Sequence, residues 1–169
     1  MSDYKLLLIV GQTGMGKTSF VKELLKNKIY VVLDPAGAWY GIKEIQNLNE
    51  LKGYRKDKSI RITTLLYKNE VEVVSTIQNF KKINLVIDDA DTFIFYRNKI
   101  IYNPFFYAYR HLQQNVFVIC HSFDDVPRPV LRTADFFVVF PHISKILNIP
   151  SGEKFNPKIY KREDISRYL

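Results

Sequence analysis

The sequence at residues 11–18 is Gly11-Gln12-Thr13-Gly14-Met15-Gly16-Lys17-Thr18, which matches the pattern G-x-x-x-x-G-K-[S/T] in full. A continuous apolar run at residues 6–10 precedes it, as expected for a parallel strand that is buried on both faces. Residues 18–26 follow, and their apolar side chains repeat with the spacing of one helical face. A strand, a glycine-rich loop and a helix in this order predict a phosphate-binding loop. The alternative is a glycine turn beside a surface lysine.

The chemistry of this loop suits the phosphates of a nucleotide. Its glycines allow backbone angles and a close approach that a Cβ would block, so that successive N–H groups surround an anion at a helix start. We expect Lys17 to reach the β- and γ-phosphates and the Thr18 hydroxyl to ligate Mg²⁺. The residues expected to hold the phosphates are Gly11, Gln12, Thr13, Gly14, Met15, Gly16, Lys17, Thr18 and Ser19.

A second segment supplies the acidic half of the expected site. Residues 83–87 form another apolar run, which Asp88 and Asp89 follow directly. Ligands bind at the carboxyl ends of the strands in open α/β sheets. We therefore expect Asp88 to hold Mg²⁺ and Asp89 to polarise an attacking water as a general base. The alternative for Asp89 is an N-cap of the next helix, a role for which Asp91 competes.

Strand-like and helix-like segments alternate along the chain, which predicts an α/β domain with a mostly parallel sheet. Five core strands are expected near residues 5, 30, 84, 116 and 136, with residues 60–66 as an additional edge strand. The wide spacing of the two motifs indicates a three-layer, RecA-like (ASCE) P-loop NTPase, in which a strand is inserted between the two motif strands. Asn103-Pro104 predicts a helix start, with that helix ending near Gln114, and Pro127 predicts the start of another.

Length and charge limit the remaining possibilities. The 169 residues suit one domain, which we place at residues 1–150, with a basic tail at 151–169 that packs on it or extends from it. The net charge of +8 favours a polyanion such as nucleic acid as a partner, an inert basic surface being the alternative. The lone Cys120 and the lack of a long apolar run predict a cytoplasmic protein with a buried thiol and no membrane span.

With these motifs, the chain resembles the FtsK–HerA superfamily of DNA-pumping ATPases, and most of all its viral and phage genome-packaging branch. Besides the two Walker motifs, residues 32–40 are similar to a segment of strand, Asp-Pro, small residue, glycine and aromatic residues. Residues 109–140 are similar to an arginine-bearing helix, a sensor strand, a short helix and a last strand. The resemblance implies a hexameric ring with ATP between subunits, double-stranded DNA in the centre, and capsid proteins as partners in the host cytoplasm or the virion.

The resemblance also implies roles for residues outside the Walker motifs. Arg110 stands where the family places an arginine that reaches a neighbouring subunit's site, with Arg128 and Arg132 as competitors and a helix-terminal ion pair as the alternative. His121 or Ser122 stands where the family has a polar sensor, commonly glutamine. A histidine there departs from the family pattern, and a capping or core role is the alternative.

Two other classes of function are compatible with a phosphate-binding loop. A small-molecule kinase, acting on a nucleoside or nucleotide, would be expected to carry an arginine-rich lid, which we do not find. A nucleotide-dependent regulatory module of the GTPase kind would carry an Asn-Lys-x-Asp motif, which is also missing, so ATP is favoured over GTP. Several basic segments are candidates for phosphate contacts, although each alone is more typical of a solvated face: residues 54–58, Lys81-Lys82, Arg97 with Lys99, and residues 158–167.

Overall fold

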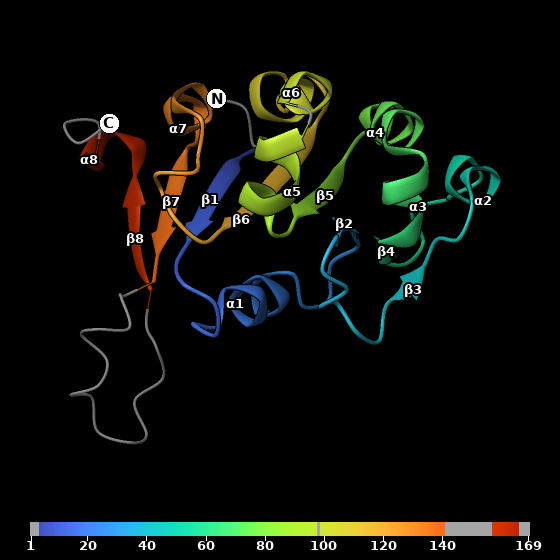
Figure 1. The fold of residues 1–169 in the computed structure, drawn as a ribbon, viewed down its shortest axis with the longest axis horizontal. Coiled ribbons are helices and arrows are strands. Elements are labelled where there is room, and N and C mark those ends of the chain that lie inside the picture. The colour runs from blue at the N-terminus through green and yellow to red at the C-terminus, as the bar shows by residue number, and fades with distance from the viewer. Residues whose placement is uncertain (1–3, 98, 141–156, 166–169) are drawn as a thin grey trace.

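The computed structural model describes residues 4–97, 99–140 and 157–165, which form a single eight-stranded sheet with helices on both faces. The order of strands is β3-β4-β2-β5-β6-β1-β7-β8, and all neighbours are parallel except β7 and β8 (Figure 1). The strands are β1 Leu6–Val10, β2 Tyr30–Leu33, β3 Lys43–Glu44, β4 Ile60–Ile62, β5 Ile83–Ile87, β6 Gln114–Cys120, β7 Phe136–Val139 and β8 Lys158–Lys161.

The helices divide unequally between the two faces of the sheet. Figure 1 shows α1 on one face and α2 to α7 on the other, so the domain has the three layers that the sequence predicts. The helices are α1 Lys17–Leu24, α2 Leu48–Lys52, α3 Thr64–Lys68, α4 Glu70–Gln78, α5 Ala90–Arg97, α6 Lys99–Tyr107, α7 Arg128–Thr133 and α8 Arg162–Ile165.

Alternation along the strands gives each face its own apolar core. In β1, Leu6 and Leu8 pack into the larger core beneath α2 to α7, whereas Ile9 packs into the smaller core beneath α1. The central strands are buried on both sides, which explains why they appear in the sequence as continuous apolar runs. Cys120 ends β6 fully buried, as expected, and burial raises the pKa of its thiol.

The five predicted core strands are confirmed, but the predicted bounds around Pro104 are wrong. Helix α6 begins at Lys99, with Pro104 in its interior, so Asn103 is not its N-cap. The helix ends at Tyr107, and Gln114 begins β6 instead of ending a helix. Gln114 is buried and its amide donates to the carbonyls of Ile77 and Phe80, a long-range contact that local sequence patterns do not reveal.

The predicted edge strand at residues 60–66 also needs correction. Only Ile60–Ile62 are extended, and this strand, β4, has β3 on its outer side, so it is not at the edge. Residues Thr64–Lys68 form helix α3. At the other edge, part of the basic tail forms β8, which pairs antiparallel with β7. Within the described residues, no helix has the length and apolar character needed to cross a membrane.

Candidate nucleotide-binding site

The glycine-rich loop leaves the carboxyl end of β1 and leads into α1. The N–H of Gly11 donates to the carbonyl of Cys120 at 3.2 Å, which ties the loop to the end of β6. Gly14 and Gly16 have φ angles of 82° and 86°, a region that favours glycine. Gly11 meets a different constraint, since a Cβ there would lie 2.5 Å from Cβ of Phe140. The sequence predicted both constraints without showing which glycine meets which.

Lys17 is enclosed by this loop. Only 6% of the residue is exposed. Its Nζ donates to the carbonyl of Gly11 and, at 3.1 Å, to that of Gln12. Burial lowers the pKa of Lys17, and the charges of Asp89 and Asp88 oppose that shift. The ammonium group is thus held against the loop, and Lys17 lines the pocket at the start of α1 together with Gly14, Gly16 and Thr18.

Asp88 lies at the carboxyl end of β5 and is almost fully buried. Its Oδ2 accepts from the Thr18 hydroxyl at 3.3 Å and from the indole N–H of Trp39 at 2.6 Å, while Oδ1 accepts from the backbone N–H of Asp89. Burial raises the pKa of Asp88, and the Trp39 hydrogen bond opposes that shift by stabilising the carboxylate. The two residues predicted to bind Mg²⁺ are therefore adjacent.

The donor set fits Mg²⁺ bound together with phosphate. A hydroxyl and a carboxylate are hard oxygen ligands of the kind that Mg²⁺ prefers, and it commonly takes its other ligands from phosphates and water. Among the described residues, no three His, Cys, Asp or Glu side chains gather to form a complete metal site. Thr18 and Asp88 would supply the protein's share of the ligands.

Asp89, Asp91 and His121 form a second polar group beside Asp88. Nε2 of His121 lies 3.5 Å from a carboxylate oxygen of Asp89, and Nδ1 lies 3.1 Å from Oδ1 of Asp91. The backbone N–H of His121 also donates to Asp91, at 2.6 Å. Burial raises the pKa of Asp89, and the charge of His121 opposes this. The carbonyl oxygen of Asp89 accepts a hydrogen bond from the N–H of Thr92. Asp89, whose φ is 47°, therefore leads into α5 through its main chain and not through its carboxylate.

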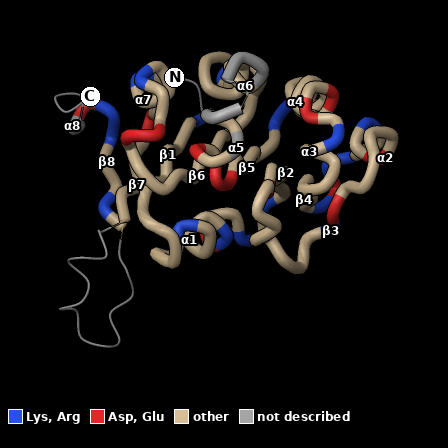
Figure 2. Tube along the Cα trace, viewed as in Figure 1, with Lys and Arg blue, Asp and Glu red and all other residues tan. Residues whose placement is uncertain are grey.

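These groups surround a pocket of about 480 Å³ at the carboxyl edge of the sheet. Figure 2 shows the acidic turn between β5 and α5, which faces this edge. The pocket is lined by Thr13, Gly14, Met15, Gly16, Lys17, Thr18, Ser19, Ala38, Asp88, Asp89 and His121. The structure thus brings together most of the predicted site residues, with His121 facing the pocket.

The other predicted residues lie elsewhere. Ser122 does not line the pocket, and its hydroxyl accepts from the N–H of Asp124. Arg110 pairs with Asp135 just before β7, at the edge where the strands begin, so it lies at the opposite end of the sheet from its own chain's pocket. Arg128 and Arg132 are exposed on α7. The structure does not describe the side chains of Arg97 and Lys99.

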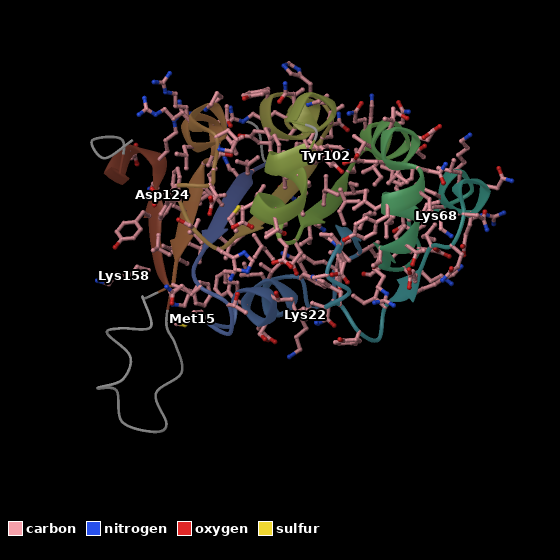
Figure 3. The ribbon with its side chains drawn as sticks, in the orientation of Figure 1. Met15, Lys22, Lys68, Tyr102, Asp124 and Lys158 are labelled. Atoms are coloured by element: carbon pink, nitrogen blue, oxygen red, sulfur yellow. The ribbon has the colours of Figure 1, made fainter. Side chains whose placement is uncertain are left out.

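Sequence patterns did not show two of the contacts at the site. Trp39 is fully buried, and its hydrogen bond to Asp88 was not predicted. Asp34 is also buried, and its carboxylate accepts hydrogen bonds from the N–H groups of Ala38 and Trp39. These hydrogen bonds fold the segment after β2 and so allow the Trp39 indole to reach Asp88. On α1, Nζ of Lys22 (labelled in Figure 3) lies over the face of the Trp39 ring, 5.0 Å from its centroid.

Comparisons with known proteins define the class of fold. The chain has a P-loop NTPase fold with a mostly parallel sheet. No family model matches the sequence, and no curated protein matches it. Solved structures do match. One is the genome packaging NTPase B204 from Sulfolobus turreted icosahedral virus 2 in complex with AMPPCP, with a TM-score of 0.72 and 17% identity, covering 97% of this chain and 95% of that one.

Two further structures support the same assignment of fold. B204, the DNA-packaging ATPase from Sulfolobus turreted icosahedral virus, aligns with a TM-score of 0.67 and 18% identity over 97% of this chain and 95% of that one. The cytoplasmic domain of the type VII secretion ATPase EccC from Thermomonospora curvata has a TM-score of 0.61 and 9% identity, over 95% of this chain and 23% of that one. The resemblance seen in the sequence is confirmed at the level of the fold.

Proposed function

We propose that this protein is an ATP-hydrolysing motor that moves double-stranded DNA, and that its task is to package a viral genome into a capsid. The observation that carries the proposal is the single pocket at which Lys17, Asp88, Asp89 and His121 meet. Two features support the choice of partner: the fold is shared with a genome packaging NTPase, and the net charge of +8 attracts a polyanion.

In this account, the loop binds the phosphates of ATP and the acidic edge activates water. The N–H groups of the loop and Lys17 hold the phosphates, and Thr18 and Asp88 provide ligands to Mg²⁺. Bound Mg²⁺ supplies neutralisation of the charge on the phosphate oxygens. Asp89 takes a proton from the attacking water, as a general base. Asp91 lies against Nδ1 of His121, and so holds the ring with Nε2 towards Asp89 and the pocket.

We propose that Arg110 acts on the site of a neighbouring subunit in a hexameric ring. Its position at the opposite edge from its own pocket supports this, because a head-to-tail arrangement of subunits would bring that edge towards the next pocket. We further propose that residues 1–150 are the ATPase domain and residues 151–169 its basic tail, of which Lys158–Lys161 form β8. We also propose that the protein works with capsid proteins in the host cytoplasm or the virion.

Hydrolysis of ATP, measured with and without duplex DNA, tests this function against the alternatives. Phosphate release should rise when duplex DNA is added, and the rise should shrink as salt is increased, because salt weakens phosphate contacts. A parallel assay offers nucleosides and nucleotides as acceptors. If DNA has no effect and an acceptor becomes phosphorylated, the protein is a small-molecule kinase. If nucleotide binds without turnover, it is a regulatory module, and the motor is rejected.

A further inference from the structure

Three turns lie side by side at the edge of the sheet opposite the nucleotide pocket. They lead into β4, β2 and β5, which are neighbours and run parallel, so that all three strands begin at this edge. The sequence scatters these turns over more than fifty residues, and the fold brings them together. They carry the set that we call the basic turn cluster: Lys28, Arg55, Lys56, Lys58, Lys81 and Lys82.

Hydrogen bonds fix the three turns to one another. Nζ of Lys56 donates to the carbonyl of Lys81 at 3.0 Å, and so joins the turn before β4 to the turn before β5. The hydroxyl of Ser59 donates to the carbonyl of Lys28 at 3.4 Å, and so joins the turns before β4 and β2. The basic turn cluster is therefore one connected surface.

The three turns that carry the basic turn cluster contain far more basic than acidic residues. Asp57 is the one carboxylate within residues 53–59, 26–29 and 79–82. Outside these turns, Glu50 at α2 lies near Lys58. At the other edge of the sheet, four carboxylates surround the pocket region: Asp34, Asp88, Asp89 and Asp91. Figure 2 shows the contrast between the basic turn leading from α4 into β5 and the acidic turn leading from β5 into α5.

The backbone gives a second, independent observation. Each of the three turns contains a non-glycine residue in the left-handed region: Asn27 at φ 64°, Lys56 at 58° and Lys82 at 57°. Glycine adopts this conformation with less strain, and yet two of the three positions are lysine. The left-handed residues turn the chain into the three strands, and at Lys56 and Lys82 they do so with a basic residue where glycine would carry no charge.

We infer that the basic turn cluster binds the phosphate backbone of double-stranded DNA. This inference rests on the proposed function, for which it supplies the contact surface. Lysines that contact phosphates position a duplex without reading its sequence. Single strands are bound with exposed aromatic rings on which bases stack, whereas the aromatic ring of this surface, Tyr54, is half-buried against Phe80 with its hydroxyl bonded to the Lys58 carbonyl. Arg110 lies on the other half of this edge, beside β6 and β7. It is therefore outside the basic turn cluster and remains available for the site of the neighbouring subunit.

The test compares two variants of the full chain that lose the same charge. The first, Lys28→Gln with Lys81→Gln, removes exposed cations from two adjacent turns. The control, Lys68→Gln with Lys158→Gln, removes two exposed lysines from outside these turns, both labelled in Figure 3. The affinity for a fluorescently labelled duplex is measured by anisotropy over a salt series. The slope of log K against log [salt] is negative, and each lost phosphate contact should reduce its magnitude by about 0.9. The first variant should therefore reduce the magnitude of the slope by about 2.

The outcomes separate the inference from the proposed function. A shallower slope in the first variant and not in the control, with DNA-free hydrolysis unchanged, supports DNA binding by the basic turn cluster. Equal slopes in both variants, while duplex DNA still stimulates the wild type, overturn the inference alone. A loss of stability without a change in affinity would show that the lysines only offset helix dipoles. Binding to vesicles of anionic lipid instead of duplex DNA would also overturn it. A wild type that ignores duplex DNA contradicts the proposed function itself.

Discussion

Asp89 combines a left-handed backbone, partial burial and a close neighbour in the imidazole ring of His121. If it is the general base, Asp89→Asn keeps the shape of the side chain and removes its ability to take a proton. We predict that hydrolysis falls by about 10² to 10⁴-fold, whereas the affinity for a non-hydrolysable ATP analogue changes little. Phosphate release and analogue titration measure the two quantities. An Asp89→Asn variant that hydrolyses ATP at the wild-type rate would remove Asp89 from the mechanism.

Trp39 holds the carboxylate of Asp88 by a buried hydrogen bond, and it is the one tryptophan in the chain. Trp39→Phe keeps most of the ring and removes the donor. Because loss of a group that orients a metal ligand typically lowers metal affinity by about 10 to 100-fold, we predict that the variant needs correspondingly more Mg²⁺ to bind nucleotide. Binding without Mg²⁺ should be nearly unchanged.

The same tryptophan gives a direct readout in the wild type. Its indole lies against Asp88, so tryptophan fluorescence should change when Mg²⁺ and nucleotide are added together, and change less with nucleotide alone. Lys22→Met serves as a control, because Lys22 contacts the face of the ring and not its N–H. If Trp39→Phe and wild type require the same Mg²⁺ concentration, the hydrogen bond does not orient Asp88.

The chemistry of the site could be predicted residue by residue where a contiguous motif carries it. The loop and the Asp88-Asp89 pair follow from short patterns with a known physical purpose. The roles of Trp39 and Asp91 could not be predicted, because Trp39 meets Asp88 only through the register of β2 against β5, and Asp91 meets His121 only through the packing of α5 beside β6. These contacts are set by tertiary structure and leave no periodic signal in the sequence.

At the scale of elements, Asp135 joins the starts of two strands and the turn that carries Arg110. Its carboxylate accepts from the N–H of Leu6 at 2.9 Å and from the Tyr109 hydroxyl at 2.6 Å, and it pairs with Arg110. We predict that Asp135→Ala lowers the free energy of unfolding by about 2–3 kcal/mol, because it leaves buried donors unpaired. Asp125→Ala, an exposed aspartate, is the matched control and should change it by about 0.5 kcal/mol or less.

Urea unfolding of both variants measures these differences. Equal stabilities would show that Asp135 does not join these elements. The elements themselves were predicted best where they are long and apolar, as in β1, β5 and β6. The short strands β3 and β8 were missed, because two to four residues with charged side chains carry no strand pattern and are held only by their neighbours. Pro104 was misleading, because a proline that usually starts a helix lies inside α6.

At the scale of the whole molecule, the two edges of the sheet have different tasks in our account. The pocket lies at one edge and Arg110 at the other, so no chain can complete its own site with Arg110. Arg110→Ala should therefore be inactive alone, and so should Lys17→Ala, which keeps Arg110. Mixed in one assembly, each supplies what the other lacks, and we predict that ATPase activity returns at intermediate ratios. Without any recovery across the mixing series, Arg110 is not an arginine that acts between subunits.

The central claim is that ATP hydrolysis moves this protein along double-stranded DNA. Displacement of a third strand tests it directly: a labelled oligonucleotide is bound as a triplex to one end of a duplex, and its release is followed in time. The account predicts release that requires Mg²⁺ and ATP, stops with a non-hydrolysable analogue, and is abolished in Asp89→Asn. Vigorous hydrolysis in the presence of the duplex, with the third strand left in place, would contradict it.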